Sequence, residues 1–288
     1  MKAIYKKELR SAMNSMTGWF FAAALSALLG VYFTAYNLFF GDPYFSTSLS
    51  ATLFLLVVLV PILTMRSLAE ERQSRTDQLL LTSPVSLSGV VLGKFLALVT
   101  VFALPVLLAG LCPLIIRLNG TAFLKADYGT LLAFFLLGAM EIALGLFLSS
   151  LTASPMIAAL GTFAVLLLLS LWEGLLDFLP ASSLGNLLFL AAALLLCCLL
   201  IQVMGNHWKF TAALLVLGGG VLGGAYLHDS AAFAGIIARG LGRVSPMAVF
   251  QTFALDHVLS LTGLLLYLSL TGLLLFLTVQ ILRRRRWN

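Results

Sequence analysis

Long runs of apolar residues, separated by short polar connections, dominate the pattern of the chain. Charge-free runs reach the roughly 20 residues that an α-helix needs to cross the hydrocarbon core of a bilayer. About eight runs qualify as predicted transmembrane helices: residues 18–40, 46–65, 95–116, 128–151, 155–172, 184–204, 210–227 and 258–282. The third is expected to begin a few residues earlier, with Lys94 snorkelling to the interface. The fifth and seventh are the shortest, and a re-entrant course of either would change the count.

Composition places the chain in the same class. With 61% hydrophobic residues, 10% charged residues and a mean hydropathy of +1.08, it falls outside the range of soluble globular domains. The expected fold class is therefore all-α, a polytopic membrane helical bundle that forms a single transmembrane domain over residues 1–288.

Residues 1–16 are predicted to form a helix that lies on the bilayer surface. Lys2, Lys6 and Arg10 share one stripe at four-residue spacing. A second stripe is apolar and holds Met1, Tyr5, Leu9, Met13 and Met16. This pattern is typical of an interfacial helix on anionic lipid, although a positively charged flank of the first span is an alternative. A cleaved signal peptide is disfavoured, because the apolar run 18–40 is too long for one.

The distribution of positive charge predicts the orientation. With a cytoplasmic N-terminus, all but four of the 17 lysines and arginines face inward, the exceptions being Arg117, Lys125, Arg239 and Arg243. This asymmetry follows the positive-inside rule, and an even number of spans places both termini in the cytoplasm. The long connection 229–256 is then external. Its apolar residues predict either helices that dip into the outer interface or a structured loop packed on the span ends.

The longest polar passage, residues 65–84, connects the second and third predicted spans on the cytoplasmic side. It holds charges of both signs, interspersed along the passage. Glu71 and Arg75 stand four residues apart in the order that supports a short helix, and Pro84 would end such a helix. By itself this pattern is equally typical of a solvated helix in a loop.

One ionisable residue, Glu141, lies near the middle of the fourth predicted span. A charged, lipid-facing carboxylate there would cost about 2.5 to 3.5 kcal/mol, so the side chain is expected to face other helices or to be protonated. Two roles stay open: lining of a transport path, or a hydrogen-bonded contact between helices. The glycines of the seventh span give small-xxx-small spacings that allow close helix packing; they are Gly218, Gly219, Gly220, Gly223 and Gly224.

Most of the sequence features that could indicate a catalytic or binding site lack the residue spacing that such a site requires. Residues 89–94 are one residue short of a phosphate-binding loop and are followed by Phe95, so they do not predict a nucleotide site. His207, His228 and His257 are scattered without ligand spacing, and no metal site is expected. The three cysteines lie in apolar runs, where packing is their expected role: Cys112, Cys197 and Cys198. The basic run 283–286 is typical of a topogenic anchor, and no nucleic-acid partner is predicted.

Two short segments resemble the motifs of CAAX-type intramembrane proteases. Residues 70–75 have the form E-E-x-x-x-R, and residues 253–257 have the form F-x-x-x-H. In such an enzyme the glutamate and the histidine must meet around one water molecule. The predicted topology places Glu70 and His257 on opposite sides of the membrane, about 30 Å apart, so this activity is disfavoured.

Residues 65–85 resemble the "AEER…T.E.LL..PV" loop of ABC-2 type permeases, especially of the gliding-motility-associated branch. The chain is also similar to that branch at residues 6–9, 145–152 and 275–287, so the likeness touches nearly the whole chain. Three features depart from the pattern. Glu141 replaces a small or apolar residue, Asp77 replaces a glutamate, and about eight spans exceed the six of the basic unit, which makes the sixth and seventh resemble an added hairpin.

The resemblance implies a membrane-spanning permease subunit, with export as the direction of transport and with no ATPase site of its own. ATP and its hydrolysis would belong to a separate cytoplasmic ATPase, and the permease itself would need no cofactor. The loop 66–88 would be the coupling segment that contacts this ATPase, through Leu68, Glu70, Glu71, Arg72, Arg75, Thr76 and Asp77. The resemblance also implies a homodimer or heterodimer of permeases in a bacterial inner membrane. A membrane anchor or assembly factor for an ATPase is the alternative function.

Overall fold

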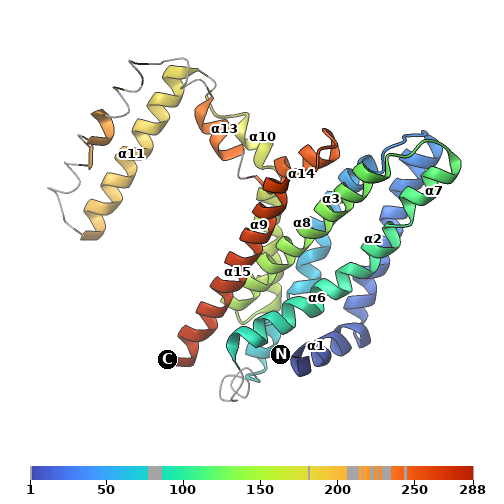
Figure 1. The fold of residues 1–288 in the computed structure, drawn as a ribbon. Helices are drawn as coiled ribbons and strands as arrows, with labels where there is room; N and C mark the ends of the chain where they lie inside the picture. Colours follow the sequence, from blue (N-terminus) through green and yellow to red (C-terminus); the bar gives the residue numbers. More distant parts are fainter. Residues whose placement is uncertain are drawn as a thin grey trace. The chain divides into compact units, whose positions relative to one another are not determined.

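The computed structural model describes residues 2–76, 86–180, 182–205, 214–215, 217–220, 224, 226, 228, 235–242 and 245–287. The regular elements of these residues are helices, with no strand among them. The chain divides into two compact units, the first formed by Met1–Ser170 with Pro246–Asn288 and the second by Leu171–Ser245. Figure 1 shows the ribbon of both units.

The first unit holds most of the helices. They are α1 (Lys2–Asn14), α2 (Met16–Phe33), the π-helix η1 (Thr34–Phe39), α3 (Ser46–Thr64), α4 (Ala69–Gln73), α6 (Leu87–Ala109), α7 (Cys112–Asn119), α8 (Leu124–Leu151), α9 (Pro155–Ser170), α14 (Pro246–Ala254) and α15 (Leu261–Trp287). The described helices of the second unit are α10 (Trp172–Leu176), α11 (Ser183–Gly205) and α13 (Ile236–Gly242).

The prediction of a multi-pass helical membrane protein is confirmed. Among the described residues, 5 helical stretches are long and apolar enough to cross a membrane: Met16–Phe39, Ser46–Gln73, Leu87–Asn119, Leu124–Leu151 and Leu261–Arg285. They coincide with the first four predicted spans and the last. The fifth predicted span corresponds to α9, which is shorter than these, and the sixth corresponds to α11, which has 23 residues. The seventh lies largely outside the described residues, so a count of eight stays a prediction.

Helix α8 is the centre of the first unit, because α3, α6, α9, α14 and α15 all pack against it. Its buried residues fall on several of its faces, as expected for a helix that is surrounded by other helices. The neighbouring helix α6 contributes Phe102, whose ring lies 6.2 Å from that of Phe21 and 6.0 Å from that of Phe134. Large apolar side chains of the outer helices are exposed, as a lipid-facing surface requires; Trp19 is 58% and Leu107 72% exposed.

Close packing of α6 on α8 depends on Gly138. A Cβ atom at this position would collide with the ring of Phe102, which is fully buried and therefore has no room to move. We expect Gly138→Ala to lower the free energy of unfolding by about 1 to 3 kcal/mol through overpacking, despite the better helix propensity of alanine. Gly161→Ala on α9 is the matched control, because no atom lies within 4 Å of its added Cβ.

Thermal unfolding of the detergent-solubilised variants would check this expectation. A Gly138→Ala protein as stable as Gly161→Ala would show that α6 and α8 are not packed as closely as described.

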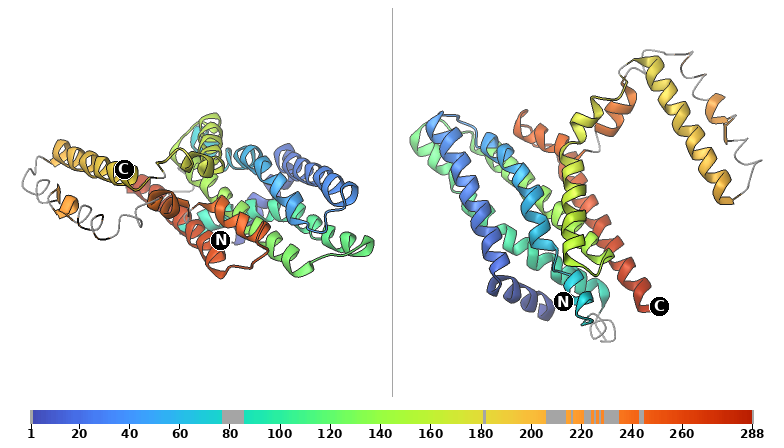
Figure 2. Two further views of the ribbon diagram at one scale, coloured as in Figure 1. Left: turned by 90° about the horizontal axis from the view of Figure 1, so that it is seen from above. Right: turned by 180° about the vertical axis from the view of Figure 1, so that it is seen from behind.

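The two ends of the first unit are formed by different segments of the chain. The N-terminus, α4 and the C-terminal end of α15 lie at one end, whereas α7 and α14 lie at the other (Figures 1 and 2). At the second end, Thr130 donates a hydrogen bond to Phe253 O (3.0 Å) and the Tyr267 hydroxyl donates one to Pro246 O (2.8 Å). Helix α14, part of the predicted external segment 229–256, is thus packed on the ends of α8 and α15.

Candidate functional site

The polar passage after α3 forms a short helix, not a long one. The passage turns at residues 65–68, forms the five-residue helix α4 and ends at Thr76, beyond which residues 77–85 are not described. Arg75 has φ +58°, in the left-handed region, so the helix cannot continue through it. The hydroxyl of Ser74 donates to Glu70 O at 2.9 Å and that of Thr76 to Glu71 O at 3.2 Å, which caps the helix end. We refer to residues 65–76, which include the described start of the predicted coupling loop 66–88, as the coupling segment.

The predicted helical pair of Glu71 and Arg75 is wrong. Arg75 follows the end of α4, so the two side chains do not share a helix face. The carboxylate of Glu71 instead lies 2.8 Å from the amine of Lys94 on α6. A buried ammonium group is a stronger partner for a carboxylate than an exposed arginine one helical turn away.

The end of α8 holds one side of the coupling segment. Ser149 Oγ accepts hydrogen bonds from Leu68 N (3.2 Å) and Ala69 N (3.0 Å) and donates one to Met65 O (3.2 Å). One hydroxyl therefore satisfies two N–H groups at the start of α4, which have no partner within the helix. Arg72 Nη1 adds a bond to Leu151 O at 3.1 Å.

Lys94 holds the other side of the segment. Its side chain is 1% exposed, and its Nζ lies 2.8 Å from Ser67 O, 2.8 Å from Glu71 Oε1 and 3.1 Å from Glu8 Oε1. An ammonium group has three N–H donors, and here each has an acceptor. The amine is thus held by acceptors of the protein itself, which the sequence did not predict; the expectation that Lys94 snorkels to the interface stays a prediction.

Glu8 brings α1 into the same cluster. Helix α1 packs on α6, where Ile4 and Tyr5 lie against Gly93 and the hydroxyls of Tyr5 and Thr100 form a hydrogen bond of 3.1 Å. Part of the apolar stripe predicted to face lipid is thus used against protein. Helix α1, the coupling segment and α6 meet at one buried lysine.

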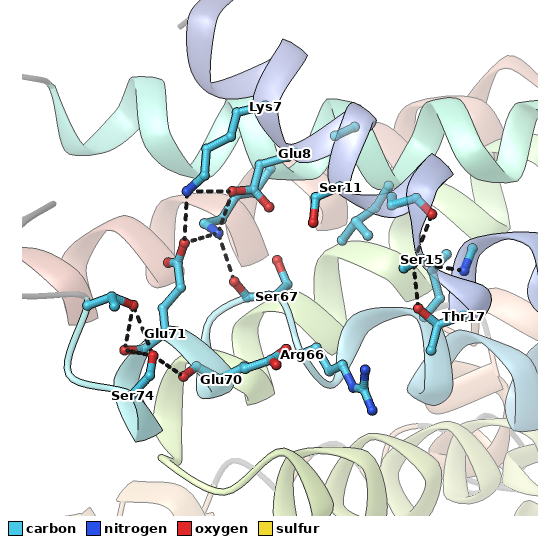
Figure 3. Close-up of a pocket in the computed structure, with 17 residues that line it drawn as sticks. Lys7, Glu8, Ser11, Ser15, Thr17, Arg66, Ser67, Glu70, Glu71 and Ser74 are labelled. Carbon is cyan, nitrogen blue, oxygen red and sulfur yellow. Dashed lines mark hydrogen bonds and ion pairs between the residues drawn. The ribbon is translucent and has the colours of Figure 1, made fainter.

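Around this cluster lies a polar hollow of about 390 Å³ between α1, α6 and the coupling segment. Figure 3 shows Lys7 pointing toward the carboxylates of Glu8 and Glu71, at distances of 3.8 and 4.0 Å. Charges of both signs line the hollow: Lys7, Arg66 and Lys94 against Glu8, Glu70 and Glu71. It therefore presents no net charge to a ligand, and the short contacts of Lys94 within it hold three segments together.

The residues predicted to contact an ATPase fall into three groups. Glu70, Arg75 and Thr76 are exposed, and so are the neighbouring Gln73 and Ser74. Leu68 is buried, and Glu71 and Arg72 are partly buried and bonded within the protein. Asp77 lies outside the described residues. The surface that the segment offers to a partner is therefore smaller than the sequence suggested.

The sequence interpretation missed Lys94, Ser149 and Glu8 as parts of this site. For Lys94 a signal existed, because a charge inside a long apolar helix needs a partner or an interface. Ser149 gave no signal in the sequence, because serine is common near helix ends and does not by itself indicate a contact with another segment. Glu8 was noted only as part of the family likeness.

Glu141 lies in the interior of the first unit, away from this site. Its side chain is 2% exposed, and its Oε2 has no hydrogen-bond partner among the described residues. It lies one turn of α8 from Gly138, which contacts Phe102, and one turn from Gly145, which contacts Thr64. Both predicted roles of Glu141 stay predictions.

The pair of residues that resembled a protease site does not come together. His257 stacks on Tyr44, with ring centroids 3.9 Å apart, immediately before α3 begins. Glu70 follows the other end of α3, which has 19 residues and is therefore about 28 Å long. The two side chains cannot share a water molecule, in agreement with the topology argument.

A bundle of apolar helices with a short polar segment fixed between two of them at one end defines a multi-pass integral membrane protein. The chain belongs to the ABC-2 family of transporter proteins, whose model matches residues 39–279. This range includes the coupling segment, Lys94 and Ser149. A comparison with curated proteins found no match.

Membership of this family makes the chain a membrane permease of an ABC transporter. Such permeases are transport components without an ATPase site of their own, and the family implies a separate ABC ATPase as partner.

Proposed function

We propose that this permease exports its substrate from a bacterial cell, the direction that its resemblance to the gliding-motility-associated branch implies. We further propose that the coupling segment is the surface on which its ATPase docks. The observation that carries the proposal is the double attachment of the segment. Ser149 holds it on α8 and Lys94 holds it on α6, while Glu70, Gln73 and Arg75 stay exposed. A segment held in this way can transmit a displacement to the bundle, whereas a mobile loop would absorb it.

In this proposal ATP binding moves the ATPase, and the coupling segment passes the movement to α6 and α8 together. These two helices lie at the core of the first unit, so their displacement would open and close a path by rigid-body motion. Two permeases, either two copies or a related pair, would enclose the path. The hairpin of residues 184–227 would bring the number of spans to eight, with both termini in the cytoplasm.

Reversal of the exposed charges tests the docking surface. We expect the double variant Glu70→Arg/Arg75→Glu to reduce capture of the partner ABC ATPase by about 30-fold, since reversed charges at the centre of an interface cost about 2 kcal/mol or more. The measurement is co-purification from detergent extracts, followed by substrate-stimulated ATP hydrolysis in proteoliposomes. Arg284→Glu, an exposed reversal at the same end of the unit, is the matched control.

Undiminished capture and transport in the double variant would exclude the coupling role. Capture of the ATPase with ATP turnover that responds to no substrate would favour the alternative function, a membrane anchor or assembly factor.

A further inference from the structure

Helix α1 carries a second, open hollow, whose lining residues all belong to this one helix. The hollow has a volume of about 560 Å³ and is lined by Ala3, Lys6, Lys7, Arg10, Ser11 and Asn14. Three cations and two neutral hydrogen-bond donors thus face one space, and no carboxylate is among the lining residues. Lys6 and Arg10 form no ion pair within the described part of the chain. The chemistry suits a phosphate anion, which these groups can neutralise and hydrogen-bond.

The position of the hollow favours a lipid over a soluble anion. Asn14 ends α1, and α2 begins two residues later with apolar side chains that are exposed, Met16 at 86% and Trp19 at 58%. Trp19 Nε1 donates a hydrogen bond to Met13 O, so the indole bridges the two helices. Tryptophan is enriched at the level of the lipid headgroups, and the exposed apolar start of α2 marks where the hydrocarbon begins. The basic hollow therefore lies beside the headgroups.

Lys7 connects this hollow with the coupling segment. Lys7 and Ser11 line both the outer hollow and the polar hollow around Lys94. The distances from Lys7 Nζ to Glu8 and Glu71, 3.8 and 4.0 Å, are long for an ion pair, and the side chain is 70% exposed. Such a pair is weak and is easily exchanged for another anion.

We propose that the outer hollow of α1 binds the phosphate headgroup of an anionic phospholipid, and that Lys7 is shared between this headgroup and Glu71. Headgroup binding draws Lys7 outward and leaves Glu71 to Lys94 alone. Binding of anionic lipid thereby changes the contacts that hold Glu71, and with it the coupling segment. The second half of this inference, the effect on coupling, rests on the proposed function; the lipid site itself does not.

Lipid retention by the permease alone tests the site. The full chain is purified in mixed micelles that contain phosphatidylcholine and phosphatidylglycerol, and the bound lipid is identified by native mass spectrometry. We expect Lys6→Gln/Arg10→Gln to retain less phosphatidylglycerol, by about fivefold for each cation removed, since each contributes about 1 kcal/mol at an anionic surface. Lys2→Gln, an exposed cation of α1 outside the hollow, should retain as much as the natural protein.

Equal retention in the double variant and the natural protein would overturn the site. Displacement of the lipid by inorganic phosphate at low concentration would overturn the assignment to a headgroup, because the hollow would then prefer a soluble anion.

Lys7→Gln tests the connection to coupling. In proteoliposomes that contain the ATPase, ATP hydrolysis by the natural protein and by Lys7→Gln is measured as phosphatidylglycerol is increased. We expect the natural protein to respond at least twofold and the variant to show no response, while both capture the ATPase equally. A lipid response that persists in Lys7→Gln would refute the role of this residue. Failure of both to capture the ATPase would refute the docking proposal, and the retention measurement would still decide the lipid site.

Discussion

Replacement of Lys94 by methionine is expected to lower the free energy of unfolding by about 2 to 4 kcal/mol, because it leaves two carboxylates and a carbonyl without their donor. Lys94 Nζ is the common partner of Ser67 O, Glu71 and Glu8, and its side chain is almost fully buried. Methionine has nearly the same shape as the lysine stem, so the packing of α6 is kept. The loss measures the charge and its hydrogen bonds.

The measurement is reversible unfolding in mixed detergent micelles, with Lys125→Met as the control for an exposed lysine. A double variant, Lys94→Met/Glu71→Gln, should be less destabilised than the sum of its single changes, because the glutamine introduced in place of Glu71 carries no charge that needs the lysine. Additive effects would mean that Lys94 and Glu71 act independently. A Lys94→Met protein as stable as the control would contradict the buried cluster.

Replacement of Glu141 by methionine should have the opposite effect and raise the stability by about 1 to 4 kcal/mol. A buried polar atom without a partner loses its hydration and gains nothing in return, so an apolar side chain of similar shape is preferred there. Glu141 Oε2 is such an atom within the described part of the chain. Glu141→Gln is the control, since it keeps a polar group of the same size and should leave the stability nearly unchanged.

We expect transport to survive in Glu141→Met, because a buried carboxyl group that does not line the transport path can be replaced by an apolar side chain of similar shape. The same unfolding assay and a transport assay with the reconstituted ATPase check both statements. A protein that is more stable but inactive would place Glu141 in the transport path. A less stable protein would mean that its carboxyl group has a partner that the structure does not reveal.

The two attachments of the coupling segment explain why its helix can be so short. A five-residue helix has few internal hydrogen bonds and does not form by itself in water. Ser149 caps its start and Lys94 neutralises Glu71 within it, so tertiary contacts supply what the local sequence lacks. The same contacts connect the segment to two core helices, which suits the proposed transmission of force.

The apolar runs and the placement of the cations determined the class of this protein. Runs of about 20 apolar residues leave the chain no other environment than a bilayer, and there the backbone can satisfy its hydrogen bonds only as helices. The polar passage that carries Glu70 was also recognised from the sequence, because it matches a family pattern and needs no knowledge of what it touches.

Only the tertiary structure decided which residues of that passage are free to contact a partner. Glu71 is separated by 23 residues from Lys94, and Ala69 by 80 from Ser149, and no local pattern predicts contacts over such distances. The sequence assigned Lys94 to the interface because a lone charge in an apolar helix must leave the hydrocarbon or find partners. Which of the two it does depends on where other helices place their carboxylates, and that is settled by packing alone.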